Sequence, residues 1–255
     1  MFTRTSLLVL LCGGGAALTA CASGSKYQGL DAAGVYRLAQ EEYESGDYGD
    51  AAETLDRLLL VYPTFEQAAE AYFLMAEAYF LDEQYITSSS EYTRFLDLYP
   101  AHPNAPSAAL GVCRSYAALS PIPQRDQTFT EQALTVCRNV VGDYQGRSEA
   151  QEAAGIANEM RDKLARKAFE GGSYYLRRDF FDSAIIYFED VVEAYPDTEW
   201  APRALAGIIE AYGEIGYDEE VELARNRLLT EYPDSPEARA LGQATSGGRP
   251  DTSGS

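Results

Sequence analysis

The sequence predicts an all-α protein, a right-handed superhelical solenoid built from five helix pairs. Three observations predict this fold. A Tyr-Pro dipeptide ends four helix-like segments, at residues 62–63, 99–100, 195–196 and 232–233. The first two of these dipeptides lie 37 residues apart, and so do the last two. Small and large apolar residues recur in phase with them, and a fixed period of this size is typical of repeat architectures.

The acidic composition argues against nucleic acids and anionic lipid surfaces as binding partners. The chain has 255 residues and a net charge of −20, with a pI near 4.3. A nucleic-acid binder needs a basic face to displace the cations around the phosphates, and this chain has none in its sequence. It also lacks the polybasic run that would hold an anionic lipid surface. The acidity favours a soluble surface or basic partners.

The first residues, "MFTRTSLLVLLCGGGAALTAC", predict a signal peptide over residues 1–20. Their apolar run is too short to span a membrane, which takes about 20 residues. Leu18-Thr19-Ala20-Cys21 resembles the lipobox of bacterial lipoproteins, in which the cysteine receives the lipid; an ordinary secretory signal is the alternative. Cys21 is therefore the expected site of a covalent lipid anchor. Ala22 follows it, as in lipoproteins sorted to the outer membrane.

The two ends of the mature chain have linker-like compositions. Residues 21–30 are expected to be the lipidated cysteine and a flexible tether, because small and polar residues predominate there. Residues 242–255 are expected to be a disordered tail. The repeat domain is therefore predicted to span residues 31–241.

Within that domain each unit ends with the same signature. Ala184 and Phe188, with Pro196 eight residues later, match the Ala-x-x-x-Phe pattern of the tetratricopeptide repeat, and the fifth unit, with Val221 and Arg225, matches it least well. Proline ends the second helix because it lacks a backbone donor and disfavours a helical residue before it. The predicted units are residues 31–63, 68–100, 105–145, 148–196 and 201–233, followed by a short final turn over 234–241.

Two units depart from the period. The third carries an insertion, "LSPIPQRD" over residues 119–126, whose two prolines predict a projecting loop between its helices. The fourth has extra residues before its signature, which predicts a long first helix over about residues 148–175.

These features together resemble the BamD (YfiO/ComL) family of outer-membrane protein assembly lipoproteins. The stretches that carry the resemblance most specifically are Tyr36 to Pro63, Phe95 to Tyr116 and Ala165 to Thr198. The resemblance implies a non-enzymatic scaffold of the β-barrel assembly (BAM) complex, lipid-anchored in the outer membrane and facing the periplasm. Its implied partners are the periplasmic domains of BamA, other lipoproteins of the complex and unfolded outer-membrane protein clients. The family's loop in the third unit is longer than the one here.

The first helix of each unit is expected to line a concave groove. Groove-facing positions counted from the proline are Tyr36, Gln40 and Tyr43 in unit one, and Phe73, Glu77 and Phe80 in unit two. The aromatic residues Tyr36, Tyr43, Phe73 and Phe80 are the candidate peptide-binding residues, because buried rings anchor bound segments. The alternative is that these rings pack against the tether or one another. In unit four the same face gives Phe169, Ser173 and Leu176.

Arg177 and Arg178 follow directly in "LRRDF", which stands out in so acidic a chain. Arginine pairs bidentately with carboxylates, and the stretch matches the part of the family that docks BamA. Either residue is therefore the candidate partner-docking contact. The alternative is a solvated pair at a helix end.

The residues give no support for catalysis or metal binding. His102 is the one histidine and lies in a turn between two prolines. No cofactor is expected beyond the lipid on Cys21. Cys113 and Cys137 occupy the small-residue positions of two helices in one unit, which favours two buried thiols, although an oxidising compartment also permits a disulfide.

A second function remains open on the sequence alone. Tetratricopeptide lipoproteins that coordinate Tol-Pal or peptidoglycan machinery in the cell envelope also carry Tyr-Pro turns. They usually have fewer repeats after a coiled coil, and no heptad run precedes residue 31 here. The barrel-assembly scaffold is therefore the favoured interpretation.

Overall fold

The computed structural model describes residues 26–246, and within them every regular element is a helix. The helices are α1 (Ala32–Ser45), α2 (Tyr48–Val61), α3 (Ala68–Leu81), α4 (Tyr85–Leu98), α5 (Ala105–Leu119), α6 (Thr128–Asp143), α7 (Ser148–Leu176), α8 (Phe181–Ala194), α9 (Trp200–Ile215), α10 (Asp218–Glu231) and α11 (Pro236–Ser246). The expected signal peptide, Cys21 and residues 247–255 of the expected tail lie outside the described residues.

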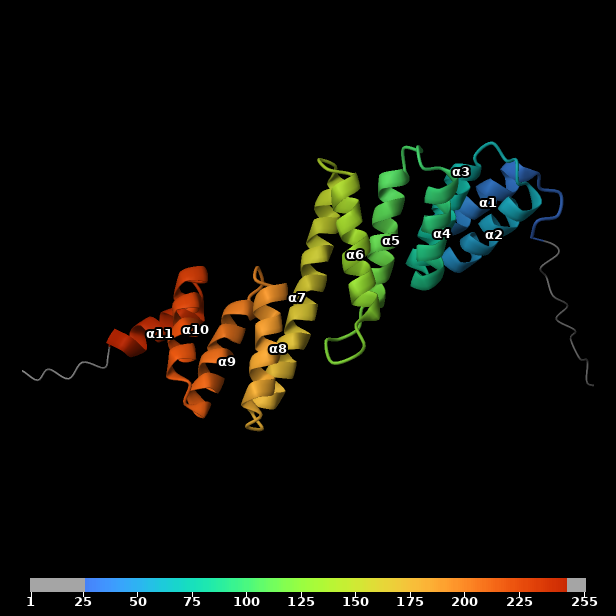
Figure 1. The fold of residues 1–255 in the computed structure, drawn as a ribbon. Coiled ribbons are helices and arrows are strands. Elements are labelled where there is room, and N and C mark those ends of the chain that lie inside the picture. The colour runs from blue at the N-terminus through green and yellow to red at the C-terminus, as the bar shows by residue number, and fades with distance from the viewer. Residues whose placement is uncertain (1–25, 247–255) are drawn as a thin grey trace, which may run out of the picture.

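The first ten helices form five successive pairs that stack into an elongated array (Figure 1). Each helix packs against the next along the chain, and the first helices of successive units also touch: α3 meets α5, α5 meets α7, α7 meets α9, and α9 meets α11. The all-α solenoid predicted from the repeat is thus confirmed. The long helix of unit four, α7, is 29 residues and joins the two halves of the array.

The Tyr-Pro turn has the same geometry wherever it occurs. At Tyr62, Tyr99, Tyr195 and Tyr232 the backbone leaves the helical region, with φ between −133° and −124° and ψ between 48° and 66°. Each of these tyrosines still donates its N–H to the carbonyl four residues earlier. Tyr144 does the same without a following proline, donating to Val140 over 3.1 Å. The proline therefore reinforces a turn that the surrounding packing already sets.

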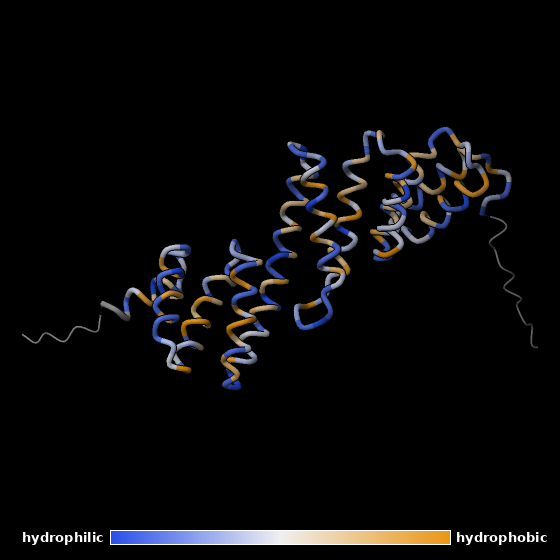
Figure 2. Tube along the Cα trace, in the orientation of Figure 1, coloured by the Kyte–Doolittle hydropathy of each residue, from blue (hydrophilic) through white to orange (hydrophobic). Residues whose placement is uncertain are grey.

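The core of each half places one large ring between small residues. Phe188 on α8 is 1% exposed, and a Cβ added at Gly172 or Gly207 would lie 2.6 Å or 2.5 Å from its ring. Tyr92 on α4 packs in the same way against Gly111, where an added Cβ would lie 2.5 Å from the ring. Hydrophobic residues recur along each helix trace between hydrophilic ones (Figure 2), as amphipathic packing requires.

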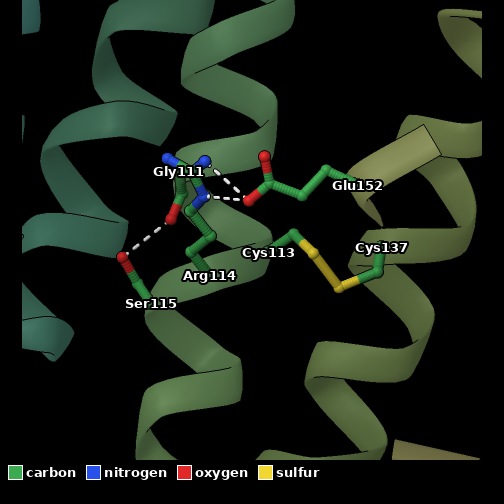
Figure 3. Close-up of a disulfide and its surroundings, with 6 residues drawn as sticks. All are labelled: Gly111, Cys113, Arg114, Ser115, Cys137 and Glu152. Carbon is green, nitrogen blue, oxygen red and sulfur yellow. Dashed lines mark hydrogen bonds and ion pairs between the residues drawn. A yellow bond between two sulfur atoms is a disulfide. The ribbon is translucent and has the colours of Figure 1, made fainter. Parts of the chain in front are cut away.

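The third unit contains a disulfide, and the interpretation as two free thiols was wrong. Cys113 on α5 and Cys137 on α6 are joined, with a Cα–Cα distance of 4.9 Å, and neither cysteine is exposed (Figure 3). Small residues at facing positions bring two helices close together. When both are cysteines, that close approach is also the spacing a disulfide needs.

The loop between α5 and α6 does not project freely. Lys163 and Lys167 on α7 donate to Ser120 Oγ over 2.8 Å and to the Arg125 carbonyl over 2.7 Å. Gln127 is 3% exposed and bridges the loop internally. The insertion is held against α7 because its carbonyls and hydroxyls have lysine donors within reach.

The last residues of the expected tether are held against unit one. The Lys26 amine lies 2.5 Å from the Glu42 carboxylate, and the Tyr27 hydroxyl lies 3.3 Å from Thr54 Oγ1. The Arg57 guanidinium stacks on the Tyr27 ring at 4.5 Å, and Leu30 joins the core of α1, α2 and α3. Residues 26–30 of the expected tether are therefore fixed on unit one, because an ion pair and an aromatic ring hold what composition alone marks as linker.

The segment after the fifth unit is a helix rather than a short turn. Ser235 Oγ accepts from the Ala238 N–H over 3.1 Å, and Pro236 occupies the first helical position. Ala238 is 3% exposed and packs with Leu228 of α10. Helix α11 continues to Ser246, so its last residues occupy the start of the segment expected to be disordered.

Candidate functional site

Two grooves open along the face formed by the first helices, one in each half of the array. The N-terminal groove, a cavity of about 380 Å³, is lined chiefly by Phe73 and Glu77 of α3, Tyr92 of α4, Ser107, Leu110 and Arg114 of α5, and Glu149 and Glu152 of α7. The C-terminal groove, about 420 Å³, is lined chiefly by Phe169, Ser173 and Leu176 of α7, Arg177 just after it, Phe188 of α8, Arg203, Gly207 and Glu210 of α9, and Glu237 of α11.

The two grooves are built from equivalent positions of the repeat. A shift of 96 residues, the distance from Tyr99 to Tyr195, carries each lining residue of units two and three onto its counterpart in units four and five. It pairs Phe73 with Phe169, Glu77 with Ser173, Tyr92 with Phe188, Ser107 with Arg203 and Arg114 with Glu210. The aromatic positions are retained, whereas the polar positions differ in charge.

Acidic side chains predominate in the N-terminal groove. Glu152 accepts from Arg114 Nε over 2.6 Å (Figure 3), and Glu149 accepts from Ser107 Oγ over 3.1 Å. Glu77 is half-buried and has no hydrogen bond or ion pair within residues 26–246. Burial raises the pKa of the Glu77 carboxyl above its ordinary value, and the Arg114 charge only partly offsets this.

A buried polar chain and the disulfide hold the walls of this groove. Ser115 on α5 donates to the Gly111 carbonyl over 2.8 Å and lies 3.2 Å from Ser88 Oγ (Figure 3 shows the first of these bonds). Ser88 on α4 in turn donates to the Ala76 carbonyl of α3 over 2.9 Å. Cys113 lies next to Arg114 along α5, so the disulfide also fixes the helix that presents the arginine.

Basic side chains gather at one end of the C-terminal groove. The Arg177 side chain is exposed and makes no hydrogen bond or ion pair among the described residues. Arg203 is paired with Glu199 over 2.6 Å, and its guanidinium also lies 4.7 Å from the centre of the Trp200 ring. Arg177 is therefore a lining cation left available to a carboxylate.

The structure places the predicted groove residues unevenly. Of the four candidate aromatic residues, Phe73 lines the N-terminal groove and also packs on Phe95. Tyr36 does not face a groove, because it is 7% exposed and packs against Phe65. The other two, Tyr43 and Phe80, lie outside both grooves and pack at 5.4 Å against Tyr48 and Tyr85, the first residues of the following helices. A tight helix–helix turn brings these rings together.

The unit-four predictions agree with the geometry more closely. Phe169, Ser173 and Leu176, expected on the groove face, all line the C-terminal groove. Arg177 lies at its edge, whereas Arg178 is exposed outside it, with its guanidinium 3.8 Å from the centre of the Tyr174 ring. The two arginines therefore present different surfaces.

Two residues that line the N-terminal groove are not among the candidate residues that the sequence indicates. Glu77 lies at a groove-facing position but is not aromatic, and Arg114 lies outside the positions counted from the proline. The signal that identifies them is the 96-residue shift, because it aligns them with Ser173 and Glu210 and exposes the change in charge.

His102, the sole histidine, has a structural role. Its Nδ1 accepts from the Asn104 N–H over 3.2 Å, and its ring packs edge-on against Phe95 at 5.4 Å. Within residues 26–246 no cluster of three or more His, Cys, Asp or Glu side chains could hold a metal ion. No helix in that range combines the length and apolarity needed to cross a bilayer.

The paired helices, the recurring turn and the two lined grooves define a tetratricopeptide-type scaffold. The chain belongs to the YfiO family, described as outer membrane lipoproteins, whose family model matches residues 29–228. The resemblance inferred from the sequence is thereby confirmed.

Curated relatives in several bacteria carry the name outer membrane protein assembly factor BamD. The protein of Caulobacter vibrioides is 29% identical over 198 residues, which cover 78% of this chain and 64% of that relative. The protein of Xylella fastidiosa strain 9a5c is 26% identical over 249 residues, covering 92% of this chain and 85% of that one. The chain thus spans less than two thirds of the Caulobacter relative.

Solved structures of repeat proteins are more distant. The TPR2AB-domain:pHSP90-complex of yeast Sti1 is 12% identical and covers 84% of each chain, with a TM-score of 0.43. YrrB, a TPR protein described as having an unusual peptide-binding site, is 16% identical and covers 84% of this chain and 92% of that one, with a TM-score of 0.32.

Proposed function

We propose that the chain is a non-enzymatic scaffold of the β-barrel assembly complex, which binds BamA and helps unfolded outer-membrane proteins to fold and insert. The observation that carries this proposal is the match of residues 29–228 to the YfiO family, combined with relatives named outer membrane protein assembly factor BamD. The two grooves are the proposed binding surfaces, because both are open and are lined by aromatic rings and charged side chains.

The grooves suit polypeptide segments rather than small metabolites. Each runs between the first helices of successive units, so an extended or helical segment can contact two or three units at once. Phe73 and Phe169 supply apolar surface, while the carboxylates and guanidinium groups can orient a bound segment through its charges. The two grooves in one rigid chain allow a client and a machine component to be held together.

The expected lipid on Cys21 would place this scaffold at the periplasmic face of the outer membrane. Residues 26–30 are fixed on unit one, and Lys26 lies only five positions after Cys21. A chain of that length reaches at most about 17 Å. The first helix pair would therefore stand close to the lipid headgroups. Replacing Cys21 with serine should release the protein from the outer-membrane fraction.

Arg177 and Arg178 are the proposed contacts for BamA. Arg177 lines the C-terminal groove without an ion pair, and Arg178 presents a guanidinium stacked on the exposed ring of Tyr174. Arginine and tyrosine are the side chains most enriched at the centres of protein interfaces. A partner carboxylate seated on these guanidinium groups would gain two parallel hydrogen bonds.

The test is co-purification of BamA with charge-reversed variants expressed at wild-type level in the parent bacterium. Arg177→Glu and Arg178→Glu should each reduce the BamA recovered at least about tenfold, the cost of breaking a desolvated charge pair. Arg37→Glu, at an exposed arginine of α1 without an ion pair, is the matched control and should leave recovery unchanged. Undiminished recovery with both variants would rule out this docking surface, and absence of BamA from the wild-type preparation would count against the proposed function itself.

A further inference from the structure

One carboxylate of the N-terminal groove has no partner. Glu149 accepts from Ser107 and Ser148, each over 3.1 Å, and Glu152 accepts from Arg114 over 2.6 Å. Glu77 lines the same groove from α3 and makes neither a hydrogen bond nor an ion pair in the described part of the chain. The only cation among the described residues that line the groove, Arg114, is thus paired with Glu152, and Glu77 is left without a partner.

The position of Glu77 makes its unpaired negative charge unfavourable. Its carboxylate is half-buried, and removing a charge from water without compensation opposes folding. The same burial raises the pKa of the carboxyl, as expected for a poorly solvated anion. A cation placed beside it would restore the lost solvation. A half-buried anion without a partner in the described chain is therefore suited to a cation supplied from outside.

The surroundings of Glu77 suit an organic cation. The rings of Phe73 and Tyr92 lie in the same groove, 5.8 Å apart between centres, and ring faces attract ammonium and guanidinium groups. Glu77, Glu149 and Glu152 face the single lining cation Arg114, so the groove is acidic as a whole. The apolar stem of a lysine or arginine would lie along the rings while its charged end reached the carboxylate.

The equivalent position in the other half lacks this feature. Ser173 takes the place of Glu77 in the C-terminal groove, and Glu210 takes the place of Arg114. The backbone and the aromatic floor are therefore shared. Among the described residues, a half-buried carboxylate without a partner lines only the N-terminal groove, because Glu210 of the C-terminal groove is exposed. The difference in charge at this position depends on one side chain, so substituting Glu77 alone removes it.

From this arrangement we propose that the N-terminal groove binds a polypeptide segment through a lysine or arginine side chain, seated between the Glu77 carboxylate and the rings of Phe73 and Tyr92. The proposal rests on the proposed function, because it names the chemistry by which the scaffold recognises a polypeptide. It assigns Glu77 as the residue that determines specificity in this groove. The C-terminal groove has no such preference.

The direct test is binding of two capped pentapeptides, Ac-Gly-Tyr-Lys-Tyr-Gly-NH2 and its Lys-to-Gln counterpart, to the full chain purified in detergent. Titration calorimetry at low ionic strength should give about tenfold tighter binding of the lysine peptide, as expected for a cation held by a ring and a partly desolvated carboxylate. The Glu77→Gln variant should bind both peptides alike. The matched control is Glu210→Gln, an unpaired carboxylate of the C-terminal groove, and it should retain the wild-type preference.

Two further readouts separate recognition from misfolding. Glu77→Gln should unfold at a higher temperature than the wild type at neutral pH, because it removes a poorly solvated charge. Lowering the pH through the Glu77 titration should abolish the preference for lysine in the wild type alone. The charged and titratable groups facing this site are Tyr43, Tyr92, Arg114, Glu149 and Glu152. Burial raises the pKa of the two tyrosines and hydrogen bonding lowers the pKa of Glu149, so these three groups shift away from the range of Glu77.

Equal affinity of the wild type for the two peptides, or a lysine preference that survives Glu77→Gln, would overturn the proposal. These outcomes are distinguishable from failure of the proposed function. Co-purification of BamA depends on the C-terminal arginines and would be unaffected by a negative result with the peptides.

Discussion

The two grooves share one construction and differ in charge. In each, a phenylalanine of the first helix and a large ring of the second helix form the floor, and the next unit approaches through a glycine, Gly111 or Gly207. Their polar residues differ at three of the equivalent positions. Among the described residues, the N-terminal groove carries a half-buried carboxylate without a partner, Glu77, and the C-terminal groove carries an exposed guanidinium group without an ion pair, Arg177.

This difference separates two levels of information in a repeat protein. Small and large residues at fixed spacing determine that a groove exists, because they set how closely successive helices approach. The residues that face the groove are free to vary without disturbing that packing. One architecture can therefore offer surfaces of different charge to different polypeptides.

The largest expected effect comes from the disulfide, which only the N-terminal half possesses among the described residues. Replacing both Cys113 and Cys137 with alanine should cost about 3 kcal/mol, the usual value for a bridge closing a loop of this length. Contacts in a solenoid are local, so the loss should fall on the N-terminal half. Urea unfolding followed by circular dichroism should shift to lower urea.

Trp200 supplies the internal control for that experiment. Its indole donates to Asp162 over 2.9 Å and packs on Phe169, so its fluorescence reports the C-terminal half. Its transition should move less than the circular dichroism transition. Equal shifts of both signals would mean that the two halves unfold as one unit. That result would contradict the prediction that the disulfide stabilises mainly the N-terminal half.

The second prediction concerns the shared floor. Gly111→Ala and Gly207→Ala should each destabilise the protein by about 1–3 kcal/mol, because the new Cβ would overlap a buried ring. Gly155→Ala and Gly213→Ala are the matched controls, since no atom lies within 4 Å of a Cβ there. They should stabilise by about 0.5–1 kcal/mol, the ordinary helix preference for alanine. Chemical denaturation measures all four, and a tolerated alanine at either floor position would show that the two floors are not equivalent.

A third, smaller effect is expected at the turns between paired helices. Glu83 in unit two and Asp179 in unit four have positive φ angles of 60° and 61°. At the equivalent turn position, units one and five have glycines, Gly46 and Gly216. Glu83→Gly should stabilise unit two by about 1 kcal/mol, because a side chain in the left-handed region crowds the following carbonyl. Asp179→Gly should gain less, since aspartate tolerates this region. Thermal melts that rank the two substitutions in the opposite order would contradict this reading of the turn.

The smallest effect is a pH dependence centred on Glu77. Burial raises the pKa of its carboxyl in the folded protein above the ordinary value of 4.5. The folded state therefore binds this proton more tightly than the unfolded state, and the associated stability is present below 4.5 and lost as pH rises through the folded-state pKa. Relative to Glu77→Gln, the wild type should lose stability across that interval and remain less stable at neutral pH.

Unfolding free energies of the two proteins measured from pH 4 to pH 7 test this. A constant difference over the range would place Glu77 in a well-solvated environment.

The sequence predicted the helix pairs closely because their ends have local causes. A proline after tyrosine disfavours helical continuation, and the small and large positions repeat in phase with it. Those signals lie within one unit and need no knowledge of the neighbours. The final helix was missed because "GQATS" lacks the apolar period, although Ala238 is buried against Leu228.

The errors arose where two units or two helices must be placed relative to each other. The disulfide depends on the facing of Cys113 and Cys137 across α5 and α6, which spacing alone does not give. Docking of Lys26 and Tyr27 depends on acceptors supplied by Glu42 and Thr54. The helical period placed Phe169, Ser173 and Leu176 of unit four on the groove face, where the structure has them, but it could not reveal that Tyr36 packs against its own partner, Phe65.

The central claim is that the first-helix face of this chain binds polypeptides during outer-membrane protein assembly. The most direct measurement is photo-crosslinking in living cells from a benzoylphenylalanine placed at Phe73 or at Phe169, which line the two grooves and which the 96-residue shift makes equivalent. Exposed Ile86 and Ile186 on the second helices serve as controls. The account predicts adducts with BamA or unfolded outer-membrane proteins from the first pair and none from the second. Adducts with Tol-Pal components, or equal yields from both pairs, would contradict it.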